Sequence, residues 1–260
     1  MFKKYVCIIA ALLIMQVSFS IAGLVWKSDT KAIGEEKENV ISFQCYAQGG
    51  NVRQDVLKGG SMPLMKEGSY MLFKKDSNSI VIINPKDKTY SELPIDAMMG
   101  IAASMMKIEP GDVKVEKLAP EVISGYKCNH IKINSNYSMK MQLMGMEMKV
   151  TQEQEIWGTK DLPVSELADL FILQAFKTGW KDLDEQISKQ ISAMQDIGFP
   201  IKSVTIVKQV SAKGAGTQTK TVESISYDIE SKKLDDAIFK VPEGYKKIEM
   251  FSPGMMRGRQ

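Results

Sequence analysis

The stretch ISFQCYAQGGNVRQDVL, residues 41–57, decides the fold class of this chain. Every second side chain from Ile41 to Ala47 is apolar, which is the period of a half-buried β-strand. Gly49-Gly50 marks a tight turn, after which the chain can run back beside the first strand. So short a connection predicts antiparallel pairing, because parallel neighbours need a long crossover between them.

Short apolar segments separated by short polar turns continue this pattern along the chain. The further strands expected are, in residue numbers, 69–75, 79–84, 88–93, 113–122, 126–135, 139–157, 202–210 and 218–229. Helices are expected at 96–107, from Pro163 to about Gly179, and at 183–194 with an end at Gly198. Each helix has a broad apolar stripe that needs burial. The sequence therefore predicts an α+β fold with the helices on one face of a large antiparallel sheet.

The N-terminal residues have the three-part layout of a secretory signal. A basic head at Lys3 and Lys4 precedes an apolar run over residues 5–19, and small residues follow up to Ala22. Residues 1–22 are therefore predicted to be a signal peptide that is cleaved near Ala22. The rest of the protein is then exported, away from cytoplasmic nucleotides and reductants.

An uncut membrane anchor is the alternative, because the apolar stretch continues through Trp26 and could span a bilayer. The rest of the chain is expected to form a single domain over 23–250, followed by a flexible tail at 251–260. The formal net charge is +3, and +1 without the two lysines of the signal. So small a charge, without a clustered basic face, argues against nucleic acid as a partner.

Three cysteines are present, and two of them, Cys45 and Cys128, follow the signal. An exported compartment is oxidising, so an even number of cysteines favours a disulfide between them. In the chain-entropy view, closing so long a loop stabilises a fold by about 4–5 kcal/mol. Two separately buried thiols are the alternative that the sequence leaves open.

The chain lacks the residue patterns of the common catalytic and cofactor sites. His130 is the only histidine, no Gly-x-Ser-x-Gly motif occurs, and a histidine on a strand is typical of a structural role. A zinc site needs several histidine or cysteine ligands. No phosphate-binding loop or dinucleotide-binding motif is present. We therefore expect no enzyme activity, no catalytic residue, no cofactor and no zinc-type metal site.

Methionine is enriched, with 18 residues, half of them in two clusters. One cluster lies on the helix expected at 96–107, which has almost no polar face. The other is the run at 139–148, where alternation places Met144, Met146 and Met148 on one face of a strand. Methionine is flexible and polarizable, so either cluster suits a core or a wall that adapts to an apolar ligand. Thioethers also suit Cu(I), although core packing alone explains the alternation.

Several motifs together resemble the strand series of the LolA-like superfamily, the exported carriers of lipoproteins to the outer membrane and their relatives. In chain order, the early motifs are NVRQD at 51–55, SYML at 69–72 and NPKDKTY at 84–90. The later ones are GYKC at 125–128, EIWGTKDL at 155–162, GFPIK at 198–202 and FKVPEGYKK at 239–247. These later motifs look like an uncharacterised branch of that group, known mainly as a domain of unknown function in bacterial exported proteins.

The resemblance implies a strongly curved antiparallel sheet, an incomplete barrel, with helices packed on its concave face. In the carriers, the hollow between sheet and helices holds acyl chains. A periplasmic location with peripheral or transient membrane contact is implied as well. Arg53 stands where carriers often have an arginine that makes a polar contact in the closed state. The methionine-rich helix and strand depart from the carrier pattern and leave the ligand undefined.

These features predict a non-enzymatic periplasmic protein that binds a lipid or other amphiphile, with a lipoprotein or another envelope protein as a further partner to consider. The expected lining of the hydrophobic cavity is apolar and comes from Met98, Ile101, Met105, Met144, Met146, Met148, Leu170 and Phe171. Two alternatives remain. One is an envelope sensor or assembly module that binds a protein partner through the same apolar surface, and the other is Cu(I) binding through the methionine clusters.

Overall fold

The structure is a computed structural model that describes residues 23–33, 40–59, 66–74, 77, 79–141, 145–162, 181–211 and 216–249. The predicted signal peptide, the helix predicted between Pro163 and Gly179, and the tail at 251–260 lie outside the described residues. Neither helix of the described part is long and apolar enough to cross a membrane.

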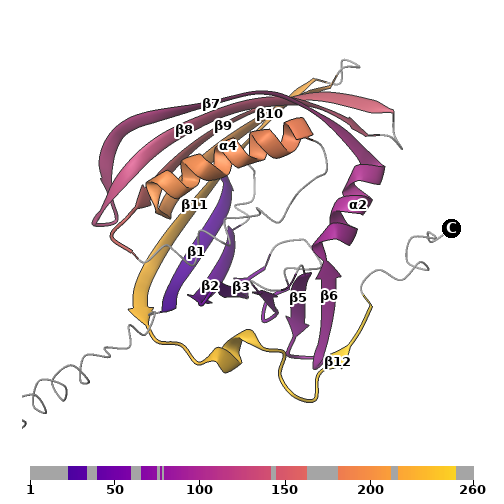
Figure 1. The fold of residues 1–260 in the computed structure, drawn as a ribbon, viewed down its shortest axis with the longest axis vertical. Coiled ribbons are helices and arrows are strands. Elements are labelled where there is room, and N and C mark those ends of the chain that lie inside the picture. Colours follow the sequence, from indigo (N-terminus) through magenta and orange to yellow (C-terminus); the bar gives the residue numbers. More distant parts are fainter. Residues whose placement is uncertain are drawn as a thin grey trace, which may run out of the picture.

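A single twelve-stranded sheet makes up most of the described chain, in the order β12-β6-β5-β4-β3-β2-β1-β11-β10-β9-β8-β7. All neighbours pair antiparallel except β12, which runs parallel to β6. The sheet is curved and unclosed (Figure 1). The strands are β1 Gly23–Ile33, β2 Val40–Gln48, β3 Asn51–Lys58, β4 Tyr70–Phe73, β5 Ser79–Asn84, β6 Thr89–Pro94, β7 Met106–Ile123, β8 Tyr126–Met141, β9 Met146–Thr159, β10 Phe199–Ser211, β11 Thr217–Lys232 and β12 Lys246–Lys247.

The curvature follows from the way helix α2, Ile95–Met105, connects two strands that are far apart in the sheet order. β6 lies next to one edge and β7 forms the other edge, so a flat sheet would separate them by about 48 Å at the usual spacing between strands. At the usual helical rise, α2 places Pro94 and Met106 only about 18 Å apart. The sheet must therefore bend back on itself, and α2 bridges its two sides (Figure 1).

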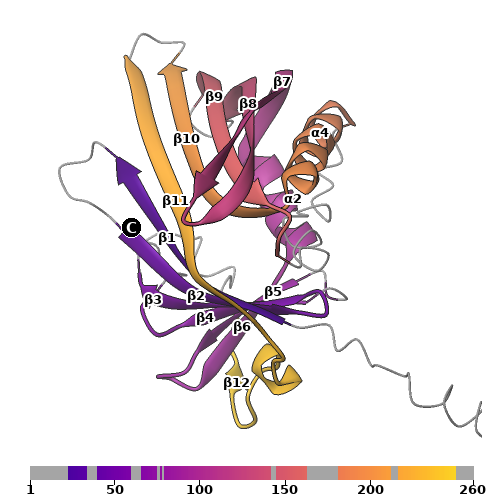
Figure 2. The same ribbon diagram turned by 90° about the vertical axis from the view of Figure 1, so that its left-hand side faces the viewer.

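The two halves of the sheet stand at a steep angle to each other. Figure 2 shows the β7–β11 part rising away from the β2–β6 part, with β11 and β1 at the bend. Register shifts in the β1–β11 pairing at Val25 and Lys27, and in the β9–β10 pairing at Pro200 and Lys202, fall at one end of these strands. Such bulges increase local twist and help a sheet to curve.

Helix α4, Lys181–Ile197, packs on β7, β8 and β9. Its last residue, Ile197, joins a buried cluster with Ile131, Ile133 and Ile156. Directly paired residues share a face of a sheet, and alternate residues along a strand return to that face. These isoleucines therefore define one face of the sheet, which we name the α4 face.

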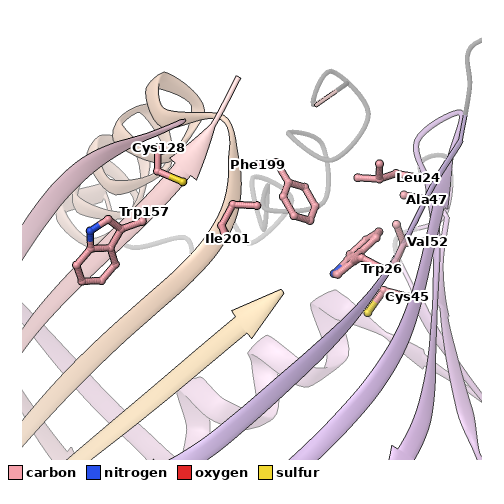
Figure 3. Packing of buried hydrophobic residues seen from close by; sticks show 9 residues of the cluster. All are labelled: Leu24, Trp26, Cys45, Ala47, Val52, Cys128, Trp157, Phe199 and Ile201. Atoms are coloured by element: carbon pink, nitrogen blue, oxygen red, sulfur yellow. The ribbon is translucent and has the colours of Figure 1, made fainter. Parts of the chain in front are cut away.

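A larger buried cluster, the base cluster, holds the ends of the central strands together (Figure 3). The rings of Trp26 and Phe199 meet edge to face, with centroids 5.4 Å apart. Gly198 turns the chain from α4 into β10 with φ of 87°, and an added Cβ there would meet the Thr159 carbonyl oxygen. The residues of the base cluster are Leu24, Trp26, Cys45, Ala47, Val52, Cys128, Trp157, Phe199 and Ile201.

The predicted disulfide between Cys45 and Cys128 is wrong, because both thiols are free and buried. Four strands lie between β2 and β8 in the sheet order, so the two cysteines are far beyond bonding distance along the sheet. Figure 3 shows Phe199 and Ile201 between them. The structure has the alternative arrangement, two separately buried thiols in one apolar cluster.

Two predicted boundaries are also wrong. The strand expected at 139–157 is divided, since β8 continues to Met141 and β9 begins at Met146, after Gly145 with φ of 56°. The helix expected at 96–107 ends at Met105 instead, and Pro110 lies inside β7 at a register shift. An edge strand tolerates proline because one side of it donates no ladder hydrogen bonds.

Candidate functional site

Methionines gather in two cross-strand rows at the end of the α4 face opposite to the base cluster. Met141 pairs with Met106 of β7 and with Met146 of β9, and Met139 pairs with Met148. Side chains opposite each other in such pairs have their Cβ atoms about 5 Å apart. Counting by twos from Ile133 along β8 places these residues on the α4 face. We name the five residues the methionine rim.

The methionine rim is not buried as the isoleucines are. Met146 is 36% exposed and the other four methionines are half-buried. Met105, the last residue of α2, precedes Met106 directly and is 44% exposed. Adjacent apolar side chains that stay in water mark a contact surface more often than scattered ones do.

The structure brings some of the sequence-predicted site residues together. Met146 and Met148 are neighbours on the rim, and Met105 adjoins it in the chain. Met98 and Ile101 are half-buried on α2, which contacts β6 and β7. The remaining predicted lining residues, Met144, Leu170 and Phe171, lie outside the described residues.

Sequence reasoning missed a band of small hydroxyl and amide side chains in the middle of the α4 face. The register links it from strand to strand: Thr30 pairs with Ser224, which pairs with Ser203. Thr205 pairs with Gln154 on β9 in the same way. We name this set the polar band; its residues are Ser28, Thr30, Ser135, Gln152, Gln154, Ser203, Thr205, Ser224 and Ser226.

Many alternate positions of the same strands carry charges, so we name the reverse side the charged face. Glu223 forms two ion pairs there. Its carboxylate oxygens lie 2.9 Å from the Nζ of Lys31 and 3.1 Å from the Nζ of Lys202. Hydrogen bonds from these lysines lower the pKa of Glu223. Lys132 pairs with Glu153 at 2.7 Å, which raises the pKa of the lysine. The sequence KSDTK at 27–31 shows the alternation, but only the register shows that it continues across five strands.

Arg53, predicted to make a closed-state polar contact, holds the segment that follows β11. Its guanidinium pairs with Asp55 at 2.6 Å and lies over the Tyr70 ring at 3.9 Å. It also donates a hydrogen bond of 3.4 Å to the carbonyl oxygen of Ile238, in the short 3-10 helix η2, Asp236–Phe239. Burial raises the pKa of Tyr70. These contacts tie η2 to β3 and β4, and a role in closure stays a prediction.

His130 is enclosed by partners that suit a structural role. Its Nδ1 lies 3.3 Å from Glu121, its Nε2 lies 3.1 Å from Glu155, and its ring stacks on Trp157 at 4.2 Å. Lys202 lies 5.3 Å from the centre of the same indole. In the part of the chain that the structure describes, no group of three or more His, Cys, Asp and Glu residues could hold a metal ion.

The solved structures that match this chain share little sequence with it. An uncharacterised conserved protein from Thermus thermophilus has a TM-score of 0.40 and 11% identity, with 92% of this chain and 98% of that chain covered. A LolA superfamily protein from Nitrosomonas europaea has a TM-score of 0.31 and 10% identity, with 84% and 90% covered. An outer membrane lipoprotein-sorting protein domain, described as putative, from Vibrio parahaemolyticus has a TM-score of 0.31 and 7% identity, with 84% and 89% covered.

All three TM-scores lie below 0.5, so none of these likenesses says what this chain binds. No curated protein matches the sequence. One family description does match, over residues 33–245, and it reads "Domain of unknown function (DUF4412)". The match confirms the predicted membership of an uncharacterised family, with a LolA superfamily protein among the similar structures. The chain belongs to the DUF4412 family.

Proposed function

We propose that this protein is an exported, non-enzymatic carrier-like protein of the bacterial periplasm that binds a lipid or other amphiphile on the α4 face. The observation that carries the proposal is the methionine rim, a set of flexible apolar side chains left half-exposed beside a curved sheet. Fully covering one such side chain is worth about 1.5–3 kcal/mol. An acyl chain laid across the rim would gain this energy without a covalent step.

The shape of the sheet supports this use of the rim. The two sides of the sheet come within about 18 Å of each other at α2, so the bend leaves a concave side. We place α2 and α4 on that side, where α4 covers the isoleucine end of the α4 face and leaves the methionine end open. The ligand would then be covered from the side of α2 by Met98, Ile101 and Met105. Met144, Leu170 and Phe171 would complete the lining of the site.

Replacing rim methionines by glutamine tests the proposal, because glutamine keeps the length of the side chain but adds an amide. The probe is N-phenylnaphthylamine, a neutral dye that fluoresces in apolar surroundings. Met146→Gln combined with Met148→Gln should weaken dye binding at least about tenfold, equal to about 1.4 kcal/mol. Ile206→Gln is the matched control, since Ile206 lies on the charged face and is 37% exposed. Equal weakening by both changes would overturn the proposal.

Native mass spectrometry of the protein purified from a bacterial host gives a second test. The proposal expects co-purifying acyl species of defined mass, and a clean apo mass counts against it. A stoichiometric envelope protein found in place of lipid would instead support a sensor or assembly module. Retention of Cu(I) against a competing chelator, lost when the rim methionines are changed, would support thioether binding of copper.

The proposed location has its own measurement. N-terminal sequencing of the exported protein should find a start near Gly23, which would show cleavage after the predicted signal at 1–22. A start at Met1 would show a retained N-terminal anchor. Either result leaves residues 23–250 outside the cytoplasm, as the carrier-like function requires.

A further inference from the structure

The polar band is unusual for the inner side of a half-buried sheet. Such a face is normally apolar when it packs on a core and charged when it faces bulk water. Here the central strands instead carry mainly uncharged hydroxyl and amide groups on the α4 face, with Val207, Val222 and the exposed Lys220 among them. On the charged face, several of the alternate positions carry charged side chains that pair with each other. The band therefore differs both from a core and from an ordinary solvent-facing surface.

Most groups of the polar band have no partner within the described part of the chain. Thr30 and Ser224 bond to each other, with their hydroxyl oxygens 2.8 Å apart. No side-chain hydrogen bond joins Ser203, Thr205 or Gln154 to another described residue. The same holds for Ser28, Ser135, Gln152 and Ser226. Among described side chains, only the Trp157 Nε1 is both fully enclosed and unpartnered.

Ser135 and Ser226 are buried and the other groups of the polar band are half-buried. Apart from the Thr30–Ser224 pair, no described residue satisfies their side-chain donors and acceptors. Hydroxyl and primary amide groups can each donate and accept, so they match esters, amides and hydroxyls. They supply no counter-charge for an ionised group. Lys220, which shares a cross-strand row with Gln152, is exposed and already has an interaction of its own. Moving a charge from water onto such a face without an opposite charge is strongly unfavourable.

We propose that the polar band selects amphiphiles whose polar part is uncharged, and that it binds the ester, amide or hydroxyl groups next to the acyl chain. This inference rests on the proposed function, because it assigns the apolar part of the same ligand to the methionine rim. Along β9, Gln152 lies four residues from Met148, or about 13 Å at the usual rise of a strand. One molecule can therefore span both regions.

The test compares two lipids of equal chain length, monopalmitoylglycerol and palmitate, at pH 8, where the second is a carboxylate. Binding is measured by calorimetric titration below the concentrations at which the lipids aggregate. Wild-type protein should bind the neutral lipid at least about tenfold more tightly. Ser203→Ala combined with Thr205→Val removes two hydroxyls at nearly constant volume. This variant should lose about tenfold in affinity for the neutral lipid and keep its affinity for palmitate.

Thr221→Val is the matched control, since Thr221 is also half-buried on a neighbouring strand but lies on the charged face. It should change neither affinity, and circular dichroism and urea unfolding show whether each variant keeps its fold. Equal affinity for both lipids in the wild type, or tighter binding of palmitate, would overturn the inference while leaving the proposed function standing. Binding of neither lipid would overturn both.

Discussion

The two ends of β8 and β9 present different side chains on the same face of the sheet. At one end, Ile131, Ile133 and Ile156 are no more than 2% exposed beneath α4. At the other end, Met139 and Met148 occupy the equivalent alternating positions and remain half-exposed. Branched isoleucine has few rotamers and defines one packing arrangement, whereas methionine adapts to whatever covers it.

This difference suggests that one end of each strand serves stability and the other end serves binding. The isoleucine end and the base cluster contribute the buried area that stabilises the fold. The side chains of the methionine rim are less buried, and methionine is flexible enough to adapt its shape to a partner. If that division holds, substitutions at the first end should lower stability, and those at the second should lower binding while leaving stability almost unchanged.

The largest expected effect comes from truncating a side chain under α4. Ile156→Ala should lower the free energy of unfolding by about 2–5 kcal/mol, because it removes buried contacts and leaves a cavity. Met148→Ala should lower it by less than about 1 kcal/mol, since the native side chain is half-exposed. Urea denaturation followed by circular dichroism measures both. Similar losses at the two sites would remove the division between the two ends.

The two ends of the sheet also differ in how they tolerate a side chain at a glycine, Gly198 beside the base cluster and Gly145 beside the methionine rim. Gly198 and Gly145 both have positive φ, which costs an alanine about 1–2 kcal/mol. An added Cβ at Gly145 meets nothing within 4 Å, whereas at Gly198 it would lie 2.3 Å from the Thr159 carbonyl oxygen. Gly198→Ala should therefore lower the free energy of unfolding by more than about 2 kcal/mol, and by more than Gly145→Ala does. Thermal unfolding of the two variants measures both losses. A larger loss for Gly145→Ala than for Gly198→Ala would show that the base cluster is packed less tightly than the rim.

Thiol reactivity compares the two ends without a large change in stability. Burial raises the pKa of Cys45 to about 12 and raises that of Cys128, so at pH 8 both stay protonated as well as covered. In a chain that begins at residue 23, Ellman's reagent should leave both thiols unmodified until the protein unfolds. A cysteine introduced by Met146→Cys should react within minutes in the native state. Rapid native reaction of Cys45 or Cys128 would show that the base opens.

The smallest expected effect is on the charged face, behind both regions. Lys31 and Lys202 hold the pKa of Glu223 below its usual value of 4.5, so the ion pairs stabilise the fold above that pH and are lost as the pH falls. Glu223→Gln should lower the free energy of unfolding by up to about 1 kcal/mol at pH 7. Urea unfolding at pH 7 and pH 3.5 should show this difference shrinking at the lower pH. If the stability difference between the wild type and Glu223→Gln were as large at pH 3.5 as at pH 7, the effect would come from packing of the side chain and not from its charge.

Local sequence patterns predicted the parts of the fold that local interactions determine. The hairpin read from residues 41–57 is confirmed as β2 and β3, and the helix predicted at 183–194 lies within α4. Gly198 ends that helix as expected. In each case, an apolar period and a glycine at the turn were enough.

The parts that depend on distant strands could not be read in the same way. Cys45 and Cys128 share a cluster but not a bond, and only the strand order shows how far apart they are. Alternation suggested one strand at 139–157, although positive φ at Gly145 separates Met141 from Met146 and makes them partners. The polar band escaped notice because its residues become neighbours only when β1, β11 and β10 are aligned.

Helix α2 restrains the shape of the bent sheet, because it connects β6 on one flank directly to β7 on the other. Its length limits how far apart the two flanks can lie at this point. Removing one turn would draw the flanks about 5 Å closer, and inserting one would spread them by the same amount. A change in the length of this single segment would therefore alter the distance between the two flanks and leave every strand pairing intact.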